Sequence, residues 1–126
     1  MLTVRFENNN NMVQIFEVLC VKKIPCGTNF VMYDENNPVA YWQMHIELSP
    51  SPVAVIDEIF FKEDVEDGDK KFFVHAIFYK LIEGAPLQVR INGLHNELKK
   101  FGFVEINGNM EVYSKNINLH YMCGVK

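Results

Sequence analysis

The acidic pair Asp57 and Glu58 interrupts an otherwise apolar run, residues 53–61. A strand that is apolar on both faces lies in the middle of a sheet and is covered from both sides. A carboxylate on such a half-buried strand is expected to have a raised pKa and to accept a proton through a water molecule. We therefore take Glu58 as the candidate general base. The alternative is that either acid lies at a sheet end and caps a neighbouring backbone group.

The other residues that could do chemistry form no catalytic or metal-binding pattern. No Cys-x-x-Cys motif occurs, and the sequence identifies no Cys–His pair. The histidines lack the spacing of metal ligands, and we expect a surface or structural role for each and no metal site. They are His45, His75, His95 and His120. Tyr33, Tyr41 and Trp42 could line a substrate pocket, although such residues more often pack in a core.

The composition is that of an ordinary globular protein. Of the 126 residues, 48% are hydrophobic and 13% aromatic, which argues against disorder and, at this length, indicates a single domain over residues 1–126. Three cysteines, an odd number, do not make a disulfide framework. Because no signal peptide and no bilayer-spanning apolar run are present, we expect a cytoplasmic protein without a membrane partner, as a monomer or a homodimer.

The charge balance gives no sign of a nucleic-acid partner. The net charge is −4, and basic residues adjoin one another only as the lysine pairs 22–23, 70–71 and 99–100. A nucleic-acid-binding surface needs clustered Lys and Arg, so we expect no such partner.

Hydrophobic periodicity predicts the first half of the fold. Residues 2–7 alternate as a strand, residues 12–22 form a helix behind the asparagine run 8–11, and residues 29–33 and 39–48 form a hairpin. The run 53–61 follows as a central strand. The next helix has apolar residues at helical spacing, with Asp67 or Asp69 as its cap and Gly84 as its end. These apolar residues are Val74, Ile77, Phe78, Leu81 and Ile82.

The second half continues the same alternation. Residues 87–91 form a short strand, and Asn92 caps a third helix that ends at Gly102. Asn107-Gly108 makes a tight hairpin turn between strands at residues 103–106 and 110–113, and a last strand follows at residues 119–123. The order β-α-β-β-β-α-β-α-β-β predicts an α+β fold. It consists of one twisted mixed sheet, with helices on both faces.

This order resembles the GNAT N-acetyltransferase superfamily over nearly the whole chain. The most specific match is residues 89–103, which look like the family's fifth strand, fourth helix and "lys-leu-gly-phe" ending; residues 55–61 and the following helix look like its fourth strand and third helix. The resemblance implies a GNAT-like acyl-CoA N-acyltransferase fold, acetyl-CoA, a small-molecule or peptide amine as acceptor, and Glu58 facing that amine. It also implies that the fourth and fifth strands splay to admit the pantetheine arm.

Two departures from the family bear on the cofactor. The family's Q/R-x-x-G-x-G/A turn grips the pyrophosphate with backbone N–H groups, whereas residues 62–71 hold one glycine and five acids. Leu98 stands where many members place a tyrosine that protonates the leaving thiolate. By the resemblance, the residues at the acetyl-CoA site are Phe60, Phe61, Gly68, Asp69, Lys70, Lys71 and Asn92.

We therefore expect weak acetyl-CoA binding, with a dissociation constant no better than high micromolar, because the turn lacks its usual phosphate contacts. Two functions stay open. The chain is an acetyl-CoA-dependent N-acetyltransferase acting on an unknown primary amine, or it is a GNAT-fold binding or interaction protein that no longer uses acetyl-CoA.

Overall fold

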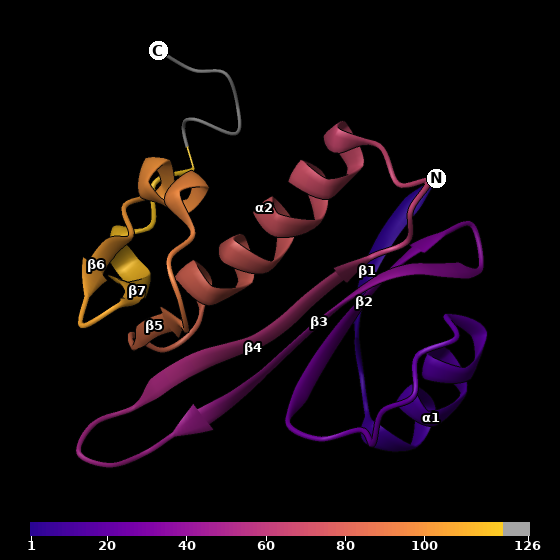
Figure 1. Cartoon of the computed structure of the whole chain (residues 1–126), viewed down its shortest axis with the longest axis horizontal. Helices are drawn as coiled ribbons and strands as arrows, with labels where there is room; N and C mark the ends of the chain where they lie inside the picture. Colours follow the sequence, from indigo (N-terminus) through magenta and orange to yellow (C-terminus); the bar gives the residue numbers. More distant parts are fainter. Residues whose placement is uncertain (120–126) are drawn as a thin grey trace.

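A computed structural model describes residues 1–119. Seven strands form one mixed sheet in the order β1-β2-β3-β4-β5-β7-β6 (Figure 1). The strands are β1 (Leu2–Glu7), β2 (Thr28–Asp34), β3 (Asn37–Glu47), β4 (Val53–Phe61), β5 (Gln88–Ile91), β6 (Val104–Ile106) and β7 (Asn109–Tyr113). The helices are α1 (Asn9–Val18), α2 (Asp67–Glu83) and the short 3-10 helices η1 (Asn96–Phe101) and η2 (Ser114–Asn116).

The two long helices cover opposite faces of the sheet (Figure 1). On α2, Phe73 and Phe78 pack edge-on against Trp42 of β3. On α1, Phe16 packs edge-on against Tyr41, the neighbour of Trp42. Consecutive residues of β3 thus face different helices, as the alternation of a strand requires. The predicted mixed sheet with helices on both faces is confirmed.

Strand β4 is central, as its two-sided apolarity predicts. It pairs antiparallel with β3 on one side and parallel with β5 on the other, and α2 makes the crossover between β4 and β5. Its bounds, Val53–Phe61, are those of the apolar run in the sequence. The candidate base Glu58 therefore sits inside the sheet, on its central strand.

A β-bulge interrupts β4 where its pairing with β5 ends. Glu58 pairs with Gln43 and Ile56 with Met44, which leaves Asp57 as an extra residue on β4. Strand β5 pairs only with residues 53–56 of β4, so within residues 1–119 no strand pairs with residues 57–61 on that side. A bulge bends a strand and increases its twist. Strand β4 thus continues past the end of its pairing with β5, as the predicted splay requires.

The third helix differs from the prediction. Asn92 caps no helix, because Gly93 has a φ of +84° and Leu94 points to solvent with 55% of its surface exposed. The helical turn begins only at Asn96, and it is a 3-10 helix. A left-handed residue directly after the cap interrupts the helical register that the sequence pattern suggests. The predicted end is confirmed, since Gly102 adopts a left-handed φ of 103°.

The first helix ends earlier than predicted, and the loop of the first hairpin is shorter than predicted. Helix α1 starts earlier, with the Asn8 side chain accepting a hydrogen bond from the Asn11 amide, and it ends at Val18 because Cys20 adopts a φ of 59°. Between β2 and β3 only residues 35 and 36 form the turn, with a φ of 58° at Glu35.

Both ends of α2 also differ in detail. Its N-cap is Glu66 rather than Asp67 or Asp69, and Gly84 has an ordinary φ of −77° rather than a left-handed one. The Asn107-Gly108 hairpin is confirmed, with φ values of 52° and 81°. Of the last predicted strand, residues 119–123, all but Leu119 lie outside the described residues.

Candidate functional site

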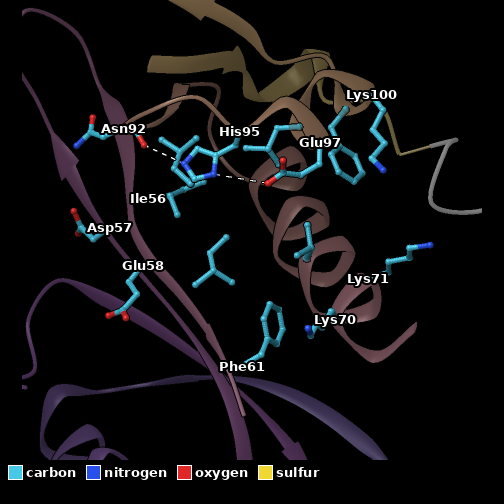
Figure 2. Close-up of a pocket in the computed structure, with 15 residues that line it drawn as sticks. Ile56, Asp57, Glu58, Phe61, Lys70, Lys71, Asn92, His95, Glu97 and Lys100 are labelled. Atoms are coloured by element: carbon cyan, nitrogen blue, oxygen red, sulfur yellow. Dashed lines mark hydrogen bonds and ion pairs between the residues drawn. The ribbon is translucent and has the colours of Figure 1, made fainter. Parts of the chain in front are cut away.

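A cavity of about 560 Å³ opens where β4 and β5 separate, and α2 and η1 form its other walls (Figure 2). Strand β4 contributes Ile59 and Phe61, and α2 contributes Val74. The turn and η1 that follow β5 contribute His95 and Phe101. A cavity at the splay of two parallel strands suits an elongated ligand, because a ligand can enter between the strands.

The edge of β4 that faces the cavity carries free backbone groups. No strand in the described part of the chain pairs with residues 57–61 on this side, and unpaired main-chain donors and acceptors are strong binding groups. An extended ligand can pair with such an edge much as a strand does. Phe61 lines the cavity and packs edge-on against Phe73, with ring centroids 5.8 Å apart.

The side chain of Phe60 points to the other face of the sheet. It stacks on Tyr41, with ring centroids 5.1 Å apart, in the core beneath α1. Of the two phenylalanines predicted to lie at the acetyl-CoA site, only Phe61 therefore presents its side chain to the cavity. Phe60 can contribute its backbone alone.

The start of α2 is open to an anion. The Glu66 side chain makes no capping hydrogen bond, and a Cβ on Gly68 would meet nothing within 4 Å. Asp67 is 94% exposed and leans toward Lys70, whose Nζ is 3.9 Å from Asp67 Oδ1. The Asp69 amide donates to the Glu66 carbonyl at 3.0 Å, but neither the Glu66 nor the Asp67 side chain covers the positive end of the helix dipole. Gly68 and the half-buried Asp69 lie in this turn, outside the cavity lining.

Three lysines line the cavity from two walls. Lys70 and Lys71 come from α2, and Lys100 comes from η1 (Figure 2). Lys70 Nζ also lies 5.7 Å from the ring centroid of Phe61, which is cation–π distance. The sequence indicates Lys70 and Lys71 through their place near the start of α2. Lys100 gives no such signal, because a lysine pair at a helix end looks like an ordinary solvated end.

The turn between β5 and η1 brings an imidazole to the cavity. His95 Nε2 donates a hydrogen bond to the Asn92 carbonyl at 3.1 Å, and Nδ1 lies 3.8 Å from Glu97 Oε1 (Figure 2). Asn92 lines the cavity as expected, although it caps no helix. The sequence points to a surface or structural role for His95, because the histidines lack the spacing of metal ligands. Leu98 is buried in the cavity wall and cannot donate a proton.

The Glu58 carboxylate is held by two donors. Its Oε1 accepts hydrogen bonds from Lys23 Nζ at 2.5 Å and from the Tyr41 hydroxyl at 2.7 Å. Burial raises the pKa of Glu58, but the two hydrogen bonds and the Lys23 charge outweigh it, so this pKa is lowered. The raised pKa expected from the sequence is therefore wrong. Lys23 lies 35 residues away in the chain, and no local pattern reveals the contact.

Asp57 is engaged elsewhere. Its Oδ2 is 2.8 Å from His45 Nδ1, and His45 Nε2 is 3.3 Å from Glu47, which also accepts a hydrogen bond from Arg90 at 2.9 Å. The hydrogen bonds to Asp57 and Glu47 raise the pKa of His45. Asp57 and Glu58 both line the cavity where β4 forms its wall, and Figure 2 shows their carboxylates on the side of β4 away from α2. Of the two acids, Glu58 is the one without a histidine partner.

Residues 1–119 bring together no group of three or more His, Cys, Asp or Glu side chains that could hold a metal ion. No helix in this described part is long and apolar enough to cross a membrane.

The sequence matches no known family profile and no curated protein. The fold, in contrast, is similar to many solved structures. A GNAT family acetyltransferase from Brucella melitensis in complex with acetyl-CoA superposes with a TM-score of 0.67 at 8% identity, over 90% of this chain and 88% of that one. The KacTA–DNA complex gives a TM-score of 0.63 at 9% identity, over 98% and 99% of the two chains.

A third similar structure is the AtaT–AtaR complex bound to DNA, with a TM-score of 0.63 at 10% identity over 96% and 99% of the two chains. Two structures of this fold are thus complexes that contain DNA. The exclusion of a nucleic-acid partner, which we drew from the charge balance, is therefore wrong. The net charge of one chain does not report on the assembly in which that chain works.

The KacTA–DNA and AtaT–AtaR superpositions cover nearly the full length of both chains, so the likeness extends over the whole fold and not only one part of it. This chain therefore has the GNAT acyl-CoA N-acyltransferase fold.

Proposed function

We propose that this chain, as one domain over residues 1–126, is an acetyl-CoA-dependent N-acetyltransferase that acts on a primary amine. The observation that carries the proposal is the opening between β4 and β5, which joins a free strand edge to a cavity of about 560 Å³. We place the reaction in the cytoplasm, in keeping with the free thiols of Cys20 and Cys26.

The residues present fit the cofactor. The free edge of β4 would hold the pantetheine arm beside Phe61, and Lys70, Lys71 and Lys100 would face the phosphates together with the uncapped start of α2. Bound acetyl-CoA supplies an activated acetyl thioester. The acids of the turn oppose its phosphates, which keeps the expected affinity low.

Residues of the chain would stabilise the acetyl oxygen and accept the proton of the amine. A backbone amide near Phe60 or Phe61 would donate a hydrogen bond to the acetyl oxygen and stabilise the charge that develops there. Glu58 is ionised at neutral pH because its pKa is lowered, so it can accept the proton that the acceptor amine has to lose. Tyr41 keeps its proton, since burial and its hydrogen bond to Glu58 raise its pKa, and it orients the carboxylate.

The second candidate function is a binding or interaction protein of the same fold that transfers no acetyl group. Leu98 favours this second function, because leucine cannot donate a proton to a leaving thiolate at the cavity wall. The five acids between Glu63 and Asp69 favour it as well. In this case the partner would be another macromolecule, as in the AtaT–AtaR complex bound to DNA.

Release of CoA thiol from acetyl-CoA in the presence of a panel of primary amines separates the two candidates. We expect amine-dependent release that falls at least about 100-fold in Glu58→Gln, as for loss of a general base, while calorimetry shows unchanged binding of CoA. Glu105→Gln, an exposed acid on β6, is the matched control and should keep full activity. No CoA binding and no release with any amine would support the second candidate.

A further inference from the structure

Lys23 lies in the segment that connects α1 to β2, and its ammonium is bound on the face of the sheet opposite α2. Its Nζ is 2.5 Å from Glu58 Oε1 and 5.7 Å from the ring centroid of Tyr41. A carboxylate together with an aromatic ring is a typical site for an ammonium ion. The side chains of Lys23 and Glu58 are 28% and 40% exposed, so the contact can be reached from solvent.

The groups that receive this ammonium are rigidly held. Tyr41 is fully buried and packs between Phe16 and Phe60, each ring centroid 5.1 Å from its own. Its hydroxyl donates to the same Glu58 oxygen that Lys23 contacts, which orients the carboxylate. Glu58 and Tyr41 therefore hold their positions through the sheet and the core, independently of Lys23.

The segment that carries Lys23 is fixed at its ends and free in the middle. Val21 N donates to Phe16 O at 2.8 Å, and the Cys26 carbonyl accepts hydrogen bonds from Asn29 and Gln43 at 3.1 Å each. Between these anchors, the backbone of residues 22–25 makes no hydrogen bond to other backbone within the described part of the chain. Lys23 can therefore leave Glu58 without breaking a strand or a helix.

We propose that Glu58 and Tyr41 form the binding site for the ammonium group of the acceptor, and that Lys23 occupies this site as an internal mimic that the acceptor has to displace. The ligand class is a primary ammonium on a flexible alkyl chain, as in Lys23 itself. The inference rests on the proposed function for the identity of the acceptor, although binding of the ammonium requires no acetyl-CoA.

The test is an NMR titration of the full chain with n-butylammonium chloride, followed at the backbone amides of Tyr41 and Glu58. Removing the competitor in Lys23→Ala should strengthen binding about 10-fold or more, the value of one charge-assisted hydrogen bond. Lys23→Met, which keeps the alkyl packing over Tyr41, should give the same gain. Lys22→Ala, at the exposed neighbouring residue, should behave like the parent protein.

Two further titrations check the chemistry of the site. Adding Glu58→Gln to Lys23→Ala should abolish the gain, and n-butanol, a neutral molecule of the same chain length, should not bind Lys23→Ala. Equal binding by the parent protein and both Lys23 variants would overturn the inference, and so would a gain that survives Glu58→Gln.

Acetyl-CoA binding is measured separately by calorimetry. If acetyl-CoA binds and the ammonium does not, this inference alone fails. If the ammonium binds and acetyl-CoA does not, the proposed function fails, and Glu58 with Tyr41 remains an ammonium site.

Discussion

The chemistry of Glu58 depends on a residue that is distant in the sequence. A carboxylate on a central strand is expected to be protonated more easily than usual, yet Lys23 and Tyr41 stabilise its ionised form. Glu58 could be predicted as the candidate base from its place in an apolar run together with the resemblance to the GNAT family, which implies a glutamate on this strand. Its protonation state could not, because the Lys23 contact exists only once α1 and β2 are folded on the sheet.

The lowered pKa of Glu58 links stability to pH. Since the pKa is lower in the folded than in the unfolded chain, the pair with Lys23 stabilises the protein above the ordinary value of 4.5, and this stabilisation is lost as the pH falls through the folded pKa. Lys23→Met should raise the pKa of Glu58 and reduce stability at pH 7 by up to about 1 kcal/mol, since the pair is partly exposed. Carboxyl NMR titration and urea unfolding at pH 7 and pH 3 measure both effects. A Glu58 pKa unchanged in Lys23→Met would contradict the account.

The elements of the fold are largely readable from the sequence. The apolar run 53–61 predicts β4 with its observed bounds, and the apolar residues at helical spacing predict α2. The prediction of a helix directly after β5 is wrong, because Gly93 adopts a left-handed φ and the helical turn begins only at Asn96. The β4 bulge at Asp57 is a property of the pairing with β3, so the residues of β4 alone cannot show it.

Gly27 and Gly68 have different surroundings, so we expect a structural role for Gly27 and a ligand-binding role for Gly68. A Cβ on Gly27, whose φ is +66°, would lie 2.5 Å from the Met44 carbonyl oxygen, whereas one on Gly68 would meet nothing within 4 Å. Gly27→Ala should destabilise the protein by about 2 kcal/mol or more, while Gly68→Ala should leave it unchanged or stabilise it by up to about 1 kcal/mol. Urea unfolding checks both.

Gly68→Ala should nevertheless weaken CoA binding, if the phosphates approach the start of α2 closely. Stability lowered to the same extent in both variants would show that Gly68 is structural.

The acids of the turn before α2 should control cofactor affinity. Replacing Glu66 and Asp67 with Arg and Gly removes two negative charges from the helix start and adds one positive charge, which favours a bound diphosphate. We expect CoA to bind at least about 10-fold more tightly in this variant, and the gain to shrink at high salt because exposed charges are screened. Calorimetry at low and high ionic strength measures it. A gain that does not depend on salt would show that the acids act through backbone geometry.

At the scale of the whole molecule, the fold is conserved while the sequence is not. The similar structures share only about a tenth of their residues with this chain, yet superpose over nearly all of it. The composition correctly predicts a globular protein. The exclusion of a nucleic-acid partner was wrong, because a net charge of −4 describes one chain and not an assembly. The central claim at this scale is that the opening between β4 and β5 is an acyl-CoA slot.

An amide NMR titration with CoA tests that claim most directly. We expect the amides of Ile59, Phe60 and Phe61 to shift and to saturate with a dissociation constant in the high micromolar range. Val74→Trp, which fills the cavity from α2, should abolish these shifts, whereas Val13→Trp on the exposed face of α1 should keep them. Amides of residues 59–61 that do not respond to CoA, or that respond equally in Val74→Trp, would contradict the account.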